Sequence, residues 1–225
     1  SALLDLTEHF DGVRPERLRV MPHELERVTR NFSPGRLSAL TAAAENIRRF
    51  HAAQLTSSGA IETSPGVTCW RERRALESVG LYVPAGSAPL PSTVLMLGIP
   101  ASVAGCPRIV LCSPPRTSGD LDPMILAAAH VAGITEIYRV GGAQAIAALA
   151  YGTESVPKVE KIFGPGNRFV TAAKRIVAAD PDGCAIDLPA GPSEVLVIAD
   201  ASAPPLFAAL ELLAQAEHDA DAQSV

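Results

Sequence analysis

Four short β-rich runs recur at a near-constant pitch, and this rhythm limits the possible folds more than any other feature of the chain. The runs are 79–83, 108–112, 136–140 and 159–163. Their first residues lie 29, 28 and 23 positions apart, and each run is followed by Gly, Pro or Ser and then by an apolar segment of helical length. The expected helices are 91–105, 122–132, 143–151 and 167–179. This alternation predicts right-handed βαβ units, hence an α/β protein with a Rossmann-like parallel sheet and flanking helices.

Helical and irregular sequence precedes this rhythm, and shorter elements follow it. Ser33-Pro34 is a typical helix start and predicts a helix over 34–56. After the last βα unit we expect two further strands, 184–188 and 194–198, and a final helix over about 204–218. The core stripe of that helix is expected to be Leu206, Leu210, Leu213 and Ala214.

Composition excludes several classes of protein. The net charge is −5, and this argues against nucleic-acid binding, because phosphate contacts need clustered Lys and Arg. The most apolar stretch, 90–112, is broken by three prolines and an arginine, so no membrane-spanning segment is expected. Neither a signal peptide nor a metal-type pairing of the four cysteines is visible. We therefore expect a reduced, cytoplasmic protein that acts on small molecules.

Glycine-bearing loops follow the predicted strands, at the sheet edge where ligands of open parallel sheets bind. The dinucleotide fingerprint G-x-G-x-x-G is not met, because Phe169 stands where the third glycine of 164–169 belongs. Four such loops on one edge still favour a nucleotide site, in which Tyr82, Gln144 and Asn167 are candidate contacts. The alternative is that these glycines only form turns between strands and helices, with Tyr82 half-buried and the two amides stabilising the turns.

Gln215 and His218 form a second constellation near the end of the last helix. At a spacing of three they lie side by side on a helix surface, so an amide oxygen and an imidazole nitrogen can reach one ion. Two ligands do not close a zinc site, and a histidine in a last helical turn is also favoured by the helix dipole. Asp219 and Asp221 have the wrong sign for that dipole, which indicates a compensating cation.

Four runs of the sequence together resemble the histidinol dehydrogenase family. They are VGLYVPAGSAPLPSTVLML (79–97), RVGGAQAIAALAYGTESVPKVEKIFGPGNRFV (139–170), AIDLPAGPSEVLVIAD (185–200) and LLAQAEHDADAQSV (212–225). The resemblance implies a fold similar to that of aldehyde dehydrogenases. It also implies oxidation of L-histidinol through L-histidinaldehyde to L-histidine by a homodimer that uses NAD and zinc, at the last step of histidine biosynthesis.

The same resemblance assigns residues and domains. It implies NAD contacts at Tyr82, Gln144 and Asn167, a substrate contact at Ser193, and zinc and substrate contacts at Gln215 and His218. The expected organisation is a helical segment over 1–66, an incomplete Rossmann-like NAD-binding domain over 67–190, and the start of a second α/β domain over 191–225 that carries part of the zinc site.

The resemblance is incomplete at one point. The family's Glu-His acid/base pair and its remaining zinc ligands, an Asp and a His, lie downstream of Val225. We therefore expect the chain to be the front portion of a longer protein, with no catalytic residue within it. On its own it should neither bind zinc tightly nor oxidise histidinol.

Two other functions remain open from the sequence. One is an aldehyde dehydrogenase-like enzyme with Cys106 or Cys112 as nucleophile, although no nearby base is visible. The other is a non-catalytic nucleotide-binding or assembly module, which the absence of the acid/base pair from this sequence favours.

Overall fold

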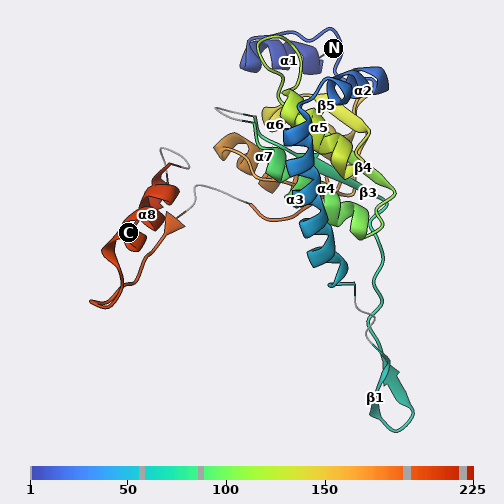
Figure 1. The fold of residues 1–225 in the computed structure, drawn as a ribbon. Coiled ribbons are helices and arrows are strands. Elements are labelled where there is room, and N and C mark those ends of the chain that lie inside the picture. Colours follow the sequence, from blue (N-terminus) through green and yellow to red (C-terminus); the bar gives the residue numbers. More distant parts are fainter. Residues whose placement is uncertain (1, 56–58, 86–88, 190–193, 218–221) are drawn as a thin grey trace.

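A computed structural model describes residues 2–55, 59–85, 89–189, 194–217 and 222–225. Its centre is a five-stranded parallel sheet in the order β5-β4-β3-β6-β7. Figure 1 shows β3, β4 and β5 of this sheet among the helices that cover it. The strands are β3 (Ser78–Tyr82), β4 (Arg108–Ser113), β5 (Glu136–Arg139), β6 (Lys161–Phe163) and β7 (Ala185–Ile186). The chain runs outward from β3 through β4 to β5 and then returns to the other side of β3, so the topological switch lies between β3 and β6.

Helices cover both faces of this sheet, and the pleat decides which residues meet them. One core joins Leu81, Leu111 and Ile137 to helices α4 (Pro91–Val103) and α5 (Pro123–Ala132). The other joins the strand neighbours of these residues, such as Tyr82 and Tyr138, to α6 (Gly142–Tyr151) and α7 (Arg168–Ala179). Because successive strand residues point to opposite faces, strands buried on both sides are apolar throughout, which explains their near-continuous hydrophobic runs.

The N-terminal helices pack on these two layers. Helices α2 (Pro22–Arg30) and α3 (Pro34–Ala52) lie over α5 and α4, and α1 (Ala2–Asp11) contacts α6. The predicted helix over 34–56 is confirmed, although it ends at Ala52.

The four predicted βα units are also confirmed, with bounds that differ by two residues or fewer at every end. The two later strands are shorter than predicted and lie in different sheets. β7 extends the central sheet beside β6, whereas β8 (Glu194–Val195) pairs in parallel with β9 (Gln223–Ser224).

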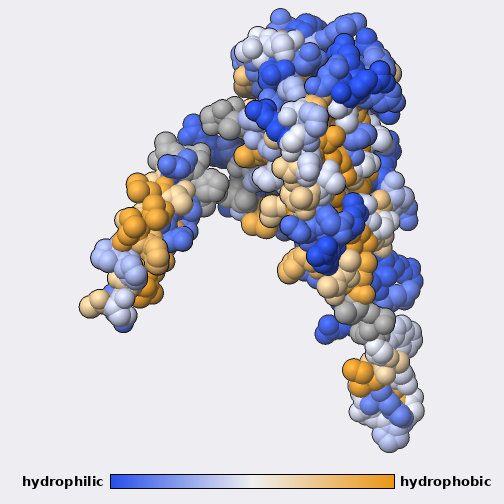
Figure 2. All heavy atoms as spheres, viewed as in Figure 1, coloured by the Kyte–Doolittle hydropathy of each residue, from blue (hydrophilic) through white to orange (hydrophobic). Residues whose placement is uncertain are grey.

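The final helix, α8 (Pro205–Ala216), is present, but its predicted core stripe is wrong for this structure. Leu206, Leu210 and Leu213 are 53–65% exposed, and Ala214 is exposed as well. Within the described residues α8 contacts only β8 and β9 appreciably, and this small unit has too few elements to cover the apolar face. Figure 2 shows the hydrophobic side chains of this unit at the surface.

The antiparallel hairpin β1 (Ile61–Ser64) and β2 (Val67–Cys69) projects away from the sheet (Figure 1). All residues of its two strands are exposed. Among the described helices, none is long and apolar enough to cross a membrane.

Candidate active site

The switch point between β3 and β6 is built by an unusually close backbone approach. Gly164, directly after β6, has a φ of +130° and lies against the end of β3, so that a Cβ there would stand 2.0 Å from the carbonyl oxygen of Tyr82. Only glycine fits this conformation and this space. The loop after β6 is therefore fixed directly beside the loop after β3.

The side chain of Tyr82 ties a third loop to this edge. Its hydroxyl oxygen accepts a hydrogen bond from the backbone N–H of Gly142, at 3.1 Å, at the start of α6. The ring is only 4% exposed, and burial raises the pKa of the phenol despite the Gly142 N–H, which lowers it. Tyr82 thus joins the ends of β3 and β5 across β4 and is a neutral group at physiological pH.

Gln144 lies in the first turn of α6, close to this hydrogen bond. Its side chain folds back over Gly142, where a Cβ would lie 2.6 Å from its Oε1. The residue is 9% exposed, and its Nε2 group is buried without a hydrogen-bond partner in the described part of the chain. An unpaired buried donor is costly, so this amide is a group that a ligand would satisfy.

Asn167 caps the next helix. Its Oδ1 accepts hydrogen bonds from the backbone N–H groups of Phe169 and Val170, both at 3.1 Å, at the first turn of α7. The stabilising role considered from the sequence is therefore present at this residue. The cap also fixes Asn167 at the carboxyl end of β6.

Sequence reasoning missed Asp11, which α1 brings to the same edge. Its carboxylate is close enough to Tyr82 to raise the pKa of that phenol electrostatically, after burial as the larger cause. Burial also raises the pKa of Asp11 itself, and its Oδ2 has no hydrogen-bond partner in the described residues. The sequence of the short N-terminal helix does not indicate that Asp11 lies near Tyr82. The packing of α1 on α6 brings it there.

The loop after β6 is also held by a buried ion pair that the sequence pattern did not reveal. Lys174 of α7 is 1% exposed, and its Nζ donates to the carbonyl oxygen of Gly164 at 2.8 Å and pairs with Asp187. The Oδ2 of Asp187 accepts from the backbone N–H of Gly164 at 2.9 Å. The signal was a lysine on the helix face that also carries Val170 and Val177, both buried.

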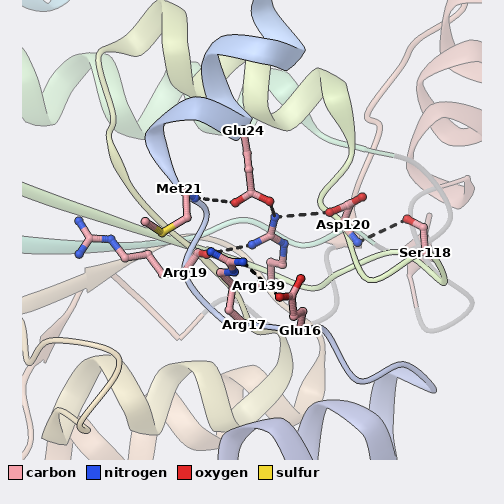
Figure 3. Close-up of polar contacts among 8 residues, drawn as sticks. All are labelled: Glu16, Arg17, Arg19, Met21, Glu24, Ser118, Asp120 and Arg139. Atoms are coloured by element: carbon pink, nitrogen blue, oxygen red, sulfur yellow. Dashed lines mark hydrogen bonds and ion pairs between the residues drawn. The ribbon is translucent and has the colours of Figure 1, made fainter.

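A second buried cation is the guanidinium of Arg139, at the end of β5 (Figure 3). Arg139 pairs with Glu24 at 2.9 Å and with Asp120 at 3.4 Å, and it donates to the carbonyl oxygen of Arg19 at 3.0 Å. These contacts fasten the segment before α2 and the loop after β4 to the sheet. The carboxylates balance the charge, so the cluster is explained by its structural role.

Of the residues predicted near the zinc ion, the structure describes only Gln215. It is half-buried in the last turn of α8. Ser193 and His218 lie outside the described residues. Within the described ranges no group of three or more His, Cys, Asp or Glu side chains could hold a metal ion.

Comparison with known proteins identifies the family. The histidinol dehydrogenase family model matches residues 1–225, the whole chain. The chain belongs to the histidinol dehydrogenase family. Histidinol dehydrogenase of Photobacterium profundum is 58% identical over 224 residues, and that of Xanthomonas oryzae is 53% identical over 223 residues. A crystal structure of histidinol dehydrogenase from Elizabethkingia anophelis superposes with a TM-score of 0.91 at 53% identity, over 99% of this chain.

The chain spans about half the length of these histidinol dehydrogenases: it covers 50% and 52% of the two relatives and 51% of the crystallised chain. The match confirms the resemblance drawn from the four sequence runs.

Within this member of the histidinol dehydrogenase family, the cysteines do not have the setting of a nucleophile. Cys112, opposite Tyr82 in the sheet, is fully buried, and burial raises the pKa of its thiol far above the usual value. Cys106 precedes β4 and lies at the amino end of the sheet, away from the loops described above, with a pKa also raised chiefly by burial. A thiolate is the reactive form, so neither side chain favours thiol-dependent chemistry.

Proposed function

We propose that the chain is part of an NAD- and zinc-dependent histidinol dehydrogenase, which oxidises L-histidinol through L-histidinaldehyde to L-histidine. The family match over all 225 residues carries this proposal. When bound, NAD would supply the hydride acceptor for each of the two oxidations.

The cofactor would bind at the carboxyl ends of β3, β5 and β6. The buried Nε2 of Gln144, unpaired among the described residues, is a donor that fits an amide or phosphate oxygen of a dinucleotide. The N-terminus of α6 adds a favourable field for negative charge. Tyr82 would keep Gly142 in place as the backbone beneath the cofactor, and Asn167 would offer its amide nitrogen while its oxygen caps α7.

Zinc would need more ligands than the two that we assign to this chain. We assign Gln215 and His218 as two of them, with Ser193 and the same two residues in contact with the substrate. The described residues do not assemble a closed metal site. We assign the acid/base Glu-His pair and the remaining ligands to residues outside this chain, which spans 50% of the length of the Photobacterium profundum relative.

The remaining assignments follow from the same proposal. They are a homodimer, cytoplasmic localisation, and the division into segments 1–66, 67–190 and 191–225. They also include inactivity of the 225 residues alone, because the proton-transfer groups would be missing.

The test compares two purified proteins, residues 1–225 alone and the same chain followed by the downstream half. Each receives L-histidinol, NAD⁺ and Zn²⁺, and the absorbance of NADH at 340 nm and the formation of histidine are followed. We expect two NADH per histidine from the longer protein and none from residues 1–225. NAD⁺ binding by calorimetry without histidinol-dependent NADH in the longer protein would instead support a nucleotide-binding module.

A further inference from the structure

We propose that Lys174 and Asp187 are positioning residues for NAD: together they clamp both backbone groups of Gly164 and so hold the cofactor loop 164–167 against the end of β3. This inference rests on the proposed function for its ligand. It assigns a role to two residues that do not belong to the NAD, substrate or zinc contacts named above.

One ion pair supplies hydrogen-bond partners to both backbone polar groups of Gly164. Nζ of Lys174 donates to the carbonyl oxygen of Gly164, and Oδ2 of Asp187 accepts from the Gly164 N–H. The other carboxylate oxygen of Asp187 accepts both from Lys174 and from the backbone N–H of Leu188, the latter at 2.7 Å. The orientations of the two peptide units that flank Gly164 are therefore set by two charged side chains rather than by sheet pairing.

The backbone conformation of Gly164 depends on these hydrogen bonds. Gly164 lies in a backbone region that other residues rarely adopt, packed against the Tyr82 carbonyl. The strand β6 has already ended at Phe163, so no ladder hydrogen bond extends to the loop. Asn167 follows three residues later, and a shift of Gly164 would move this cap and its amide at the cofactor edge.

The clamp also joins the loop after β6 to the loop after β7. Asp187 follows β7, and its own N–H donates to the carbonyl oxygen of Ile162 in β6 at 3.0 Å. The chain then continues toward Ser193, the proposed substrate contact. Lys174 and Asp187 thus fix the start of the segment that leads to the substrate relative to the cofactor loop.

Replacing a buried ion pair by apolar side chains of similar size is often neutral for stability, whereas removing one partner leaves an uncompensated charge. This asymmetry allows a test in which stability and cofactor binding separate.

The test uses the full-length protein with three variants: Lys174→Met, the double variant Lys174→Met/Asp187→Leu, and Arg139→Met as a control that breaks another buried ion pair. We expect both Lys174 variants to raise KM for NAD⁺ at least tenfold and to change KM for histidinol by less than twofold. The double variant should melt at a higher temperature than Lys174→Met. Arg139→Met should lower the melting temperature and leave KM for NAD⁺ within twofold.

A purely structural pair would lower the amount of active protein without moving KM for NAD⁺. A double variant that melts above Lys174→Met but has a KM for NAD⁺ within twofold of the parent would therefore overturn the inference.

A second readout separates this inference from the proposed function. Hydrogen exchange of the backbone amides of Gly164, Gly166 and Asn167 should become at least tenfold faster in the double variant, with or without turnover. If the parent protein oxidises no histidinol, the proposed function fails. The positioning role is then decided by exchange alone, and unchanged exchange in 164–167 refutes it.

Discussion

Replacing Gly164 by alanine tests the close approach of β3 and β6, on which the proposed cofactor site depends. The new Cβ would lie 2.0 Å from the carbonyl oxygen of Tyr82, in a strand that is paired on both sides and cannot retreat. The backbone strain of an L residue at this φ costs roughly 1–3 kcal/mol, and overpacking costs roughly 1–3 kcal/mol more. We expect a loss of about 4 kcal/mol.

Gly133→Ala is the matched control. Gly133 ends α5 at a φ of +76°, and a Cβ there would meet nothing within 4 Å. It therefore has the left-handed strain without the clash, and we expect a loss of about 1 kcal/mol.

The assay is thermal unfolding followed by circular dichroism. For a chain of this size each kcal/mol lowers the melting temperature by roughly 2–4 °C, so we expect roughly 8–16 °C for Gly164→Ala and roughly 2–4 °C for Gly133→Ala. If both variants lose the same few degrees, the backbone contact between Gly164 and Tyr82 is absent and the arrangement of the two loops is wrong.

Further expectations follow from individual contacts. Arg139→Met leaves two carboxylates without their buried cation and should cost about 3 kcal/mol in urea unfolding; a cost below 1 kcal/mol would contradict the buried pairing in Figure 3. Burial alone would raise the pKa of Glu24, but the Met21 N–H and Arg139 outweigh it and lower that pKa. The stability from Glu24 is therefore present above its unfolded pKa and lost as the pH falls through the folded one, so Glu24→Gln should flatten the fall of the urea midpoint below about pH 5. Asn167→Ala should cost about 1 kcal/mol through the lost cap, whereas Asn167→Asp should retain stability, which melting curves of the two variants compare. A thiol reagent should modify the exposed Cys69 in the native protein and reach Cys112 only after unfolding; rapid native labelling of Cys112 would disprove its burial.

The βα framework could be predicted because its signal is local. Each strand is a short apolar run and each helix begins at a recognisable residue, such as Asp122 before Pro123 or Asn167 before Arg168. The pitch of the repeat then sets parallel pairing, and the carboxyl edge of the sheet follows from the topology alone.

Pairing between distant elements could not be predicted in the same way. Strands β7 and β8 are two residues long, and nothing local decides that one joins β6 and the other β9. Periodicity predicted which face of α8 is apolar, but not that this face stays exposed in the described structure.

At the carboxyl edge of the sheet the position of three candidate residues could be predicted, whereas their roles remain predictions. Tyr82, Gln144 and Asn167 do lie at the loops that meet there, but their present partners depend on exact backbone positions. The clamp joins Lys174 and Asp187, which are 13 positions apart, through the backbone of Gly164. The sequence shows only a glycine in a loop there, and its hydrogen bonds to both side chains form only in the folded chain.

The most direct test of the account is hydrogen exchange of the full-length protein with and without saturating NAD⁺. The account predicts slower exchange at 141–146 and 164–170, the loops and first helical turns at the carboxyl edge of the sheet. Slowing confined to the opposite edge, around the cavity of about 240 Å³ lined by residues such as Cys106 and Glu136, would contradict it. Unchanged exchange along the whole chain at a concentration of NAD⁺ that supports turnover would contradict it equally.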